Sequence, residues 1–280
     1  IEDRFVPPGA ASMVARSFAI SDVSPRAGLT WHARPELALR LGFSRGVEPP
    51  SFDDLVTVQG VYPNLGVRSR ELRAQRATTF EAGAQGQRGA VAWNVTVYRG
   101  AWRNEILRLA DANGLPRGAV NAGATRHEGM ESSLRWRLLA GPQALTLAIT
   151  STLGRFVFDH DPVYGGNRLA GAPPHVGTVE LAYEHPRGVF GAIESTWVAG
   201  RTPVDHAGRL TYGGHTLLHA RAGWRAGERW VIFLAARNLL DRAHLASTAG
   251  VLDLARAPAA TTIFLPGAGR AFTLGLEWKP

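Results

Sequence analysis

Apolar and polar residues alternate along most of this 280-residue chain, and that period of two constrains the fold more than any other feature. In 36–45, for example, Leu37, Leu39, Leu41 and Phe43 fall on one face, and Glu36, Arg40 and Ser44 fall on the other. The same alternation recurs in 89–102, 144–157, 178–184, 189–197, 218–224 and 272–279. A weaker strand is expected at 12–22, and 229–240 is a strand that the pattern does not orient. Over the whole chain we count about eleven strands and predict an all-β fold.

The connections between these segments are of two kinds that take turns along the chain. Four short ones contain turn residues: Gly86–Gly89, Ala140–Gln143, His185–Gly188 and Arg225–Glu228. The long ones cover roughly 46–74, 103–120, 158–173, 200–213 and 241–268. Short turns at one end and long loops at the other are the plan of an outer-membrane barrel, whereas so many long loops are unusual in a compact soluble domain.

Composition removes several other classes of protein. The chain has no cysteine, which excludes disulfides and thiolate metal sites, and no stretch of about 18 apolar residues that would form a transmembrane helix. The net charge is +8, but the arginines are spread along the whole chain, and Lys279 is the only lysine. This distribution does not favour nucleic-acid binding. Tryptophans near strand ends suit interfacial girdles: Trp31, Trp102, Trp136, Trp197, Trp224, Trp230 and Trp278.

Six segments resemble strand and loop motifs of TonB-dependent outer-membrane receptors, in the order that the family has them. They are LALRLGFSRGVEPPSFDDL (37–55), TTFEAGAQGQ (78–87), VYRGAWRNEIL (97–107), NAGATRHEGMESSLRW (121–136), AARNLLDRAHL (235–245) and FLPGAGRAFTLGLEWK (264–279). Each motif alone is weak, but six in order are fairly specific. No segment resembles the plug domain of that family or its energy-coupling box.

The resemblance implies a transmembrane antiparallel up-and-down β-barrel in the bacterial outer membrane. Residues 1–280 would form its C-terminal part, about 10–12 strands of a barrel with about 22. The implied function is a receptor and transporter for a scarce, bulky ligand, such as a ferric siderophore or another iron chelate, energised by the TonB complex through an N-terminal portion. The implied partners are outer-membrane lipid, lipopolysaccharide and that ligand. We expect no catalysis, no cofactor, no metal site and no nucleic-acid partner.

Two neighbouring loops hold the polar residues that we expect to contact a ligand. Arginine together with tyrosine suits anionic, aromatic-rich ligands. The candidates in the first loop are His160, Asp161, Tyr164, Asn167 and Arg168, and those in the second are Arg201, Asp205, His206, Arg209 and Tyr212.

Other interpretations stay open at this point. The strands could close into a small pore or adhesin, or form a basic soluble β-protein that binds polyanions. Residues 236–257 contain good helix formers, so a short helix in the last long loop is an alternative there. Consecutive Asp159, His160 and Asp161 have the chemistry of metal ligands, but neighbouring loop residues rarely converge on one ion. No nucleophile elbow supports a hydrolase.

Overall fold

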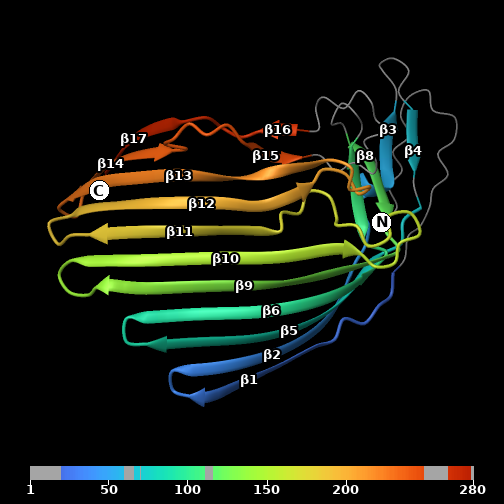
Figure 1. Ribbon diagram of the computed structural model, residues 1–280, viewed down its shortest axis with the longest axis horizontal. Coiled ribbons are helices and arrows are strands. Elements are labelled where there is room, and N and C mark those ends of the chain that lie inside the picture. The colour runs from blue at the N-terminus through green and yellow to red at the C-terminus, as the bar shows by residue number, and fades with distance from the viewer. Residues whose placement is uncertain (1–19, 60–65, 70, 111–115, 249–263, 279–280) are drawn as a thin grey trace.

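The computed structural model describes residues 20–59, 66–69, 71–110, 116–248 and 264–278. They form an antiparallel sheet of 11 strands, in which each strand pairs with the next one along the chain apart from short hairpins inside the loops (Figure 1). The sheet order is β1 (Arg26–Arg34), β2 (Leu37–Glu48), β5 (Gln75–Arg88), β6 (Val91–Arg103), β9 (Ala124–Leu139), β10 (Ala144–Phe158), β11 (His175–Glu184), β12 (Val189–Pro203), β13 (Thr211–Ala226), β14 (Trp230–Arg237) and β17 (Ala271–Trp278). The predicted all-β, up-and-down architecture is confirmed.

The two ends of the sheet differ as the loop lengths predicted. Tight turns join the strands at one end, on the left in Figure 1, and the long connections lie at the other end. The long connections have structure of their own, which the sequence analysis did not predict. They contain the helix α1 (Phe52–Leu55) and three hairpins: β3 (Val56–Gln59) with β4 (Gly66–Ser69), β7 (Ile106–Ala110) with β8 (Pro116–Asn121), and β15 (Leu245–Thr248) with β16 (Phe264–Pro266).

One face of the sheet is apolar and exposed. Leu29 on β1 lies opposite Leu41 on β2, and both side chains are about three-fifths exposed, at 63% and 59%. The orientation of β14, which the alternation left open, is settled by its pairing with β17: Trp230, Ile232 and Leu234 lie on the apolar face. Apolar side chains that stay exposed along a whole sheet need an apolar environment, such as lipid, to cover them.

The opposite face is polar. It carries Arg40 on β2, Glu81 on β5, Thr96 on β6 and Glu131 on β9. Thr96 pairs directly with Glu131, and Gly83, two residues after Glu81, pairs with both Arg40 and Thr96. Gly129 also lies on it, where the ring of Tyr98 covers the glycine. A Cβ added to Gly129 would lie 2.6 Å from Tyr98 Oη, so the close approach requires glycine.

Most tryptophans gather on the apolar face near the short turns, as expected for a girdle: Trp31, Trp93, Trp136, Trp224, Trp230 and Trp278. Trp102 is a correction. It lies on the polar face, opposite Ala77 and Thr125, because it falls on an even position of β6. Trp197 is on the apolar face but near the long loops.

Three further expectations have different outcomes. Residues 26–34 form β1, a strand that the alternation did not identify, while most of the segment expected at 12–22 lies outside the described residues. Within 236–257, the described part up to Thr248 has strand and turn but no helix. The loop expected at 200–213 is shorter, because β12 continues to Pro203 and β13 begins at Thr211. Among the described residues, no helix has the length and apolar character needed to cross a membrane.

Buried side chains concentrate at the end with the long loops. Ala122, Phe158 and Leu169 form a small core there, and Leu107, Phe156 and Tyr164 pack against it. This core holds the loops on the polar face of β6, β9 and β10, and so it positions the candidate site.

Candidate ligand-binding site

The two loops that carry the predicted ligand-binding residues pack against each other as one unit. The Asn167 side-chain amide donates to the carbonyl oxygens of His206 and Ala207, at 3.2 and 3.1 Å. The backbone N–H of Ala170 donates to His206 Nδ1 at 3.2 Å, and that of Gly171 donates to the Pro203 carbonyl at 2.8 Å. Asn167 and His206 therefore hold 159–174 against 204–210.

Two of the predicted residues are too buried to meet a ligand in this conformation. Asp205 is 0% exposed and His206 is 4% exposed. One carboxylate oxygen of Asp205 accepts the backbone N–H groups of Arg209 and Leu210, which shapes the tight loop. Burial lowers the pKa of His206, and the carboxylates of Glu105 and Asp205 offset part of that effect, so its imidazole is neutral at pH 7. Both residues maintain the loop.

The structure brings only some of the other predicted residues together. Tyr164 packs on Phe158 in the core, with ring centroids 4.9 Å apart. Asp161 accepts the backbone N–H groups of Val163 and Tyr164, as a turn-forming aspartate does. The remaining residues do not converge. His160 and Arg209 are exposed, Tyr212 is half-buried, Arg168 donates to the Gly154 carbonyl at 2.8 Å, and Arg201 donates to Thr211 Oγ1 at 2.8 Å.

A second group of residues, which the sequence analysis did not single out, lies beside these loops on the polar face. The ring of His127 lies between Trp102 and Phe156, with centroid distances of 4.9 and 4.7 Å. His127 Nε2 is 3.1 Å from Glu105 Oε2, and the same carboxylate oxygen accepts a hydrogen bond from the Thr125 hydroxyl. The side chains of His127 and Glu105 are 17% and 13% exposed.

The two groups join through β10. Phe156 contacts His127, and Phe158, two residues further, contacts His206 edge-on at 5.4 Å. We call the whole set the aromatic–histidine cluster; it comprises Trp102, Glu105, His127, Phe156, Phe158, Tyr164 and His206. One feature of the sequence could have pointed to this cluster: two aromatic residues lie on the polar face of β10. Phe156 and Phe158 occupy even positions of β10, where the preceding even positions hold Thr146, Thr150 and Thr152.

The half-buried rings of Trp102, His127 and Phe156 offer flat, polarisable surfaces, whereas Phe158 and His206 are buried, and Glu105 adds a single carboxylate. Such a surface suits ligands with aromatic rings or delocalised charge. Among the described residues, no group of three or more histidine, aspartate and glutamate side chains has the arrangement of a metal site. The cluster therefore has the chemistry to recognise an organic or chelated ligand through its rings.

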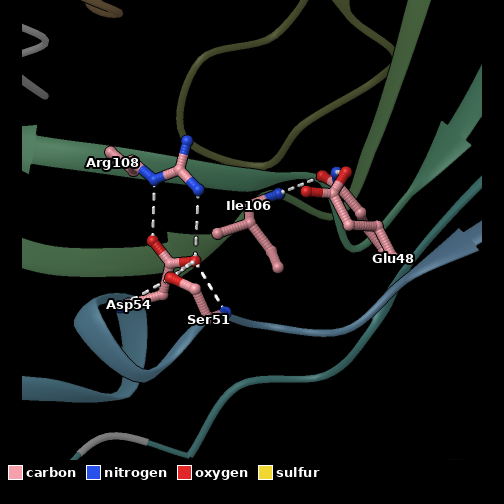
Figure 2. Close-up of polar contacts among 6 residues, drawn as sticks. Glu48, Ser51, Asp54, Ile106 and Arg108 are labelled. Atoms are coloured by element: carbon pink, nitrogen blue, oxygen red, sulfur yellow. Dashed lines mark hydrogen bonds and ion pairs between the residues drawn. The ribbon is translucent and has the colours of Figure 1, made fainter.

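A separate anchor fixes the first long loop beneath the β7–β8 hairpin. Figure 2 shows the Arg108 guanidinium facing the carboxylate of Asp54, with Nε–Oδ1 and Nη2–Oδ2 distances of 2.9 and 3.4 Å. The Ser51 hydroxyl and backbone N–H donate to the same carboxylate, at 2.7 and 2.9 Å. Burial alone would raise the pKa of Asp54, but the hydrogen bonds from Ser51 and Arg108 outweigh it and hold that pKa below its usual value.

Comparison with known proteins adds evidence on family and fold. Residues 4–239 match the family model described as TonB dependent receptor-like, beta-barrel. No curated protein sequence matches significantly. Similar solved structures include the ferric yersiniabactin uptake receptor FyuA from Yersinia pestis (TM-score 0.66, 19% identity) and the copper transporter OprC (0.69, 15%). A ferric enterobactin receptor from Pseudomonas aeruginosa, PfeA, is also similar (0.69, 17%). The matches cover 90%, 91% and 91% of this chain but 36%, 39% and 40% of the solved chains.

Proposed function

Because this chain belongs to the TonB-dependent receptor-like β-barrel family and is therefore an outer-membrane protein, we propose that it is part of an uptake receptor for a bulky metal chelate. The predicted family, fold class and location are confirmed, and members of this family are transporters, not enzymes. A soluble polyanion-binding protein is set aside. The identity of the chelate, with a ferric siderophore favoured, and the supply of energy by TonB belong to the proposal.

The observation that carries the proposal is the aromatic–histidine cluster on the polar face at the loop end. In a membrane barrel the apolar face meets lipid and the polar face lines the lumen, while the long loops lie outside the cell. The cluster then lies at the outer mouth of the lumen. A ligand entering between the loops would pass the rings of Trp102, His127 and Phe156.

The chemistry of the cluster favours a chelate over a hydrated ion. Hydrated ions need convergent oxygen or nitrogen ligands, whereas an aromatic chelator presents ring faces and delocalised negative charge. The exposed guanidinium groups of Arg201 and Arg209 lie in the adjacent 200–210 region and would attract the anionic part of such a ligand. With His160 and Tyr212, they are the predicted loop residues that we propose make the first contact.

The test is ligand binding by the receptor purified from its complete gene. Ferric complexes of a catecholate and of a phenolate siderophore, and free copper(II), are each titrated while tryptophan fluorescence is recorded. We expect one ferric chelate to quench fluorescence with saturation. Replacing Phe156 by Ala should weaken its binding by roughly threefold to tenfold, the size of one lost aromatic contact.

A matched control separates recognition from damage to the barrel. Trp31→Phe changes an exposed ring on the apolar face, so it should leave the affinity unchanged. Saturable binding of copper(II) without any chelator would replace the chelate in the proposal by the bare ion. Unchanged affinity in Phe156→Ala and in His127→Ala would remove the cluster from the binding site.

A further inference from the structure

The polar face of β10 is neutral and lined by small residues next to the aromatic–histidine cluster. From the loop end toward the short turn, it carries every second residue of the strand: Gly154, Thr152, Thr150, Ala148 and Thr146. We call these five residues the β10 track. At about 3.4 Å per residue, the stretch from Phe156 to Thr146 covers about 34 Å. In a tilted strand, that length crosses the apolar band of a membrane barrel, which is about 25 Å high.

The other strands of the described sheet carry charged or aromatic side chains on the same face. Next to the track, β9 holds Glu131 and Arg135, and β11 holds Glu180 and Glu184. Each remaining strand has at least one such side chain there: Arg26, Arg40, Glu81, Tyr98, Glu194, Arg221, Arg237 and Glu277. The track is therefore a neutral strip near the middle of the sheet, between β9 and β11 (Figure 1).

The hydroxyl groups of the track are free to bind a ligand. Thr150 is exposed, and Thr146 and Thr152 are half-buried. None of the three side chains forms a hydrogen bond with another residue in the described part of the chain. Ser133 on β9 and Thr178 on β11 lie directly opposite Thr150, so hydroxyl groups also form a row across the track. Each hydroxyl can donate one hydrogen bond and accept others.

The loop-side end of the track adjoins the aromatic–histidine cluster. The ring of Phe156 leans over Gly154, because a Cβ added to that glycine would lie 3.3 Å from Phe156 Cζ. His127 lies directly opposite Phe156 in register. A ligand that leaves these two rings toward the short turns therefore meets Gly154 first and Thr152 next.

We propose, on the basis of the uptake function proposed above, that the metal chelate crosses the barrel along the β10 track. Passage requires contacts that are favourable enough to admit a ligand and weak enough to release it. Threonine hydroxyls meet this requirement, because they replace the hydrogen bonds of water without adding a net charge. Gly154 and Ala148 leave room for a bulky ligand beside the threonines.

The strands on either side are less suited to passage. Glu131 lies directly opposite Thr152, and Glu180 lies opposite Ala148, so a carboxylate flanks the track on each side. These carboxylates repel the delocalised negative charge of an aromatic chelate and keep it over the threonines. Beyond β11, ion pairs of Glu180 with Arg221 at 3.4 Å and of Glu184 with Arg225 at 3.1 Å extend across the wall.

The experiment measures affinity and uptake separately, for the receptor expressed from its complete gene in cells with no other siderophore receptor. The probe is the ferric catecholate or phenolate complex that binds in the fluorescence titration. Thr150→Trp fills the middle of the track, about 20 Å along the strand from Phe156, so the affinity should not change. Uptake should fall at least about tenfold, which corresponds to a rise of about 1.4 kcal/mol in the barrier to passage.

Two matched controls accompany this variant. Thr273→Trp makes the same change at an exposed position of the polar face of β17, five strands away from β10, and should leave uptake unchanged. Thr150→Ser keeps a small side chain with a hydroxyl and should also import the chelate normally.

Labelling after folding separates the route from a folding defect. The 280 residues contain no cysteine, so Thr150→Cys places a single thiol in this part of the receptor. In cells that are importing the chelate, a bulky maleimide on that thiol should stop uptake, whereas a methylthio group should not. Both labels at Thr273→Cys should leave uptake unchanged. Reagents that reach Thr273→Cys but not Thr150→Cys would contradict an open track.

Equal uptake by Thr150→Trp and the unaltered receptor would overturn the proposal, as would an equal loss of uptake in Thr150→Trp and Thr273→Trp. In both cases the unaltered receptor still binds and imports the chelate, so only the route is removed and the uptake function stands. An unaltered receptor that binds no ferric chelate would remove both.

Discussion

His127 Nε2 lies 3.1 Å from Glu105 Oε2, and that contact joins the wall of the barrel to its second long connection. His127 belongs to β9, whereas Glu105 stands between β6 and β7. The same carboxylate accepts a hydrogen bond from the hydroxyl of Thr125, a residue that is 1% exposed. Glu105 therefore fixes the position of the imidazole between its two aromatic neighbours.

Replacing Glu105 by Ala should loosen the cluster without unfolding the barrel. The change leaves the buried Thr125 hydroxyl without its acceptor, which costs about 1–3 kcal/mol. We expect faster amide exchange in 103–107 and around 125–127, and weaker chelate binding, while the thermal unfolding midpoint in detergent falls only slightly. Glu105→Gln keeps an acceptor oxygen and should retain most of the protection. Equal exchange in both variants would show that Glu105 does not organise the cluster.

The contact between the loops 159–174 and 204–210 should weaken in acid. Burial lowers the pKa of His206, so the open state takes up a proton more readily than the packed state. The stabilisation is complete above the ordinary histidine pKa of about 6.5 and is lost as pH falls through the lower folded value. The protection factor of the Ala170 amide, whose N–H donates to His206 Nδ1, should therefore decrease below about pH 6.5. A protection factor that stays constant down to pH 4.5 would contradict this account.

Asp54→Asn should release the first long loop from the β7–β8 hairpin. The lowered pKa of Asp54 means that its carboxylate stabilises the fold above pH 3.8 and that this contribution disappears only as pH falls through the lower folded value. Because Arg108 is largely exposed, we expect a loss of about 1 kcal/mol. Limited proteolysis should then cut within 49–74 faster at neutral pH. Glu48→Gln, at an exposed position nearby, serves as the control and should not change the cleavage rate.

Gly129→Ala should destabilise the barrel strongly. The new Cβ would lie 2.4 Å from the Leu153 carbonyl oxygen and 2.6 Å from Tyr98 Oη, so the β9–β10 pairing must shift. Gly46→Ala provides a matched control, because a Cβ there meets nothing within 4 Å. We expect Gly129→Ala to lose its heat-modifiable electrophoretic mobility at a lower temperature than Gly46→Ala. Equal mobility curves would show that the close approach at Gly129 has little energetic weight.

The alternation of side chains predicts most of the sheet because burial in lipid and exposure to the lumen impose opposite requirements on successive residues. Leu37, Leu39 and Leu41 show this in β2. Two strands were not predicted in full. In β14, Val231 and Phe233 are also apolar and occupy the polar face, so only the pairing with β17 orients it. In β1, Arg26, Thr30 and His32 do alternate with Ala27, Leu29 and Trp31, so the pattern was present there and was overlooked.

The candidate site was harder to predict because its members come from distant parts of the chain. The sequence placed Tyr164, Asn167 and His206 in neighbouring loops, and the structure does bring them together. It could not show that Asp205 and His206 are buried, since burial depends on how two loops pack. Trp102 and His127 belong to strands, and only the register of β6 and β9 places them in contact.

The most direct test of the central claim is uptake of radioactive iron by cells that express the receptor from its complete gene and have no other siderophore receptor. The ferric chelate selected by the binding experiment is supplied to matched cells with and without TonB. We predict saturable uptake that requires TonB and falls at least about tenfold in His127→Ala/Phe156→Ala, the loss of two aromatic contacts. Entry at the same rate without TonB, or equal uptake by the double variant, would contradict the account.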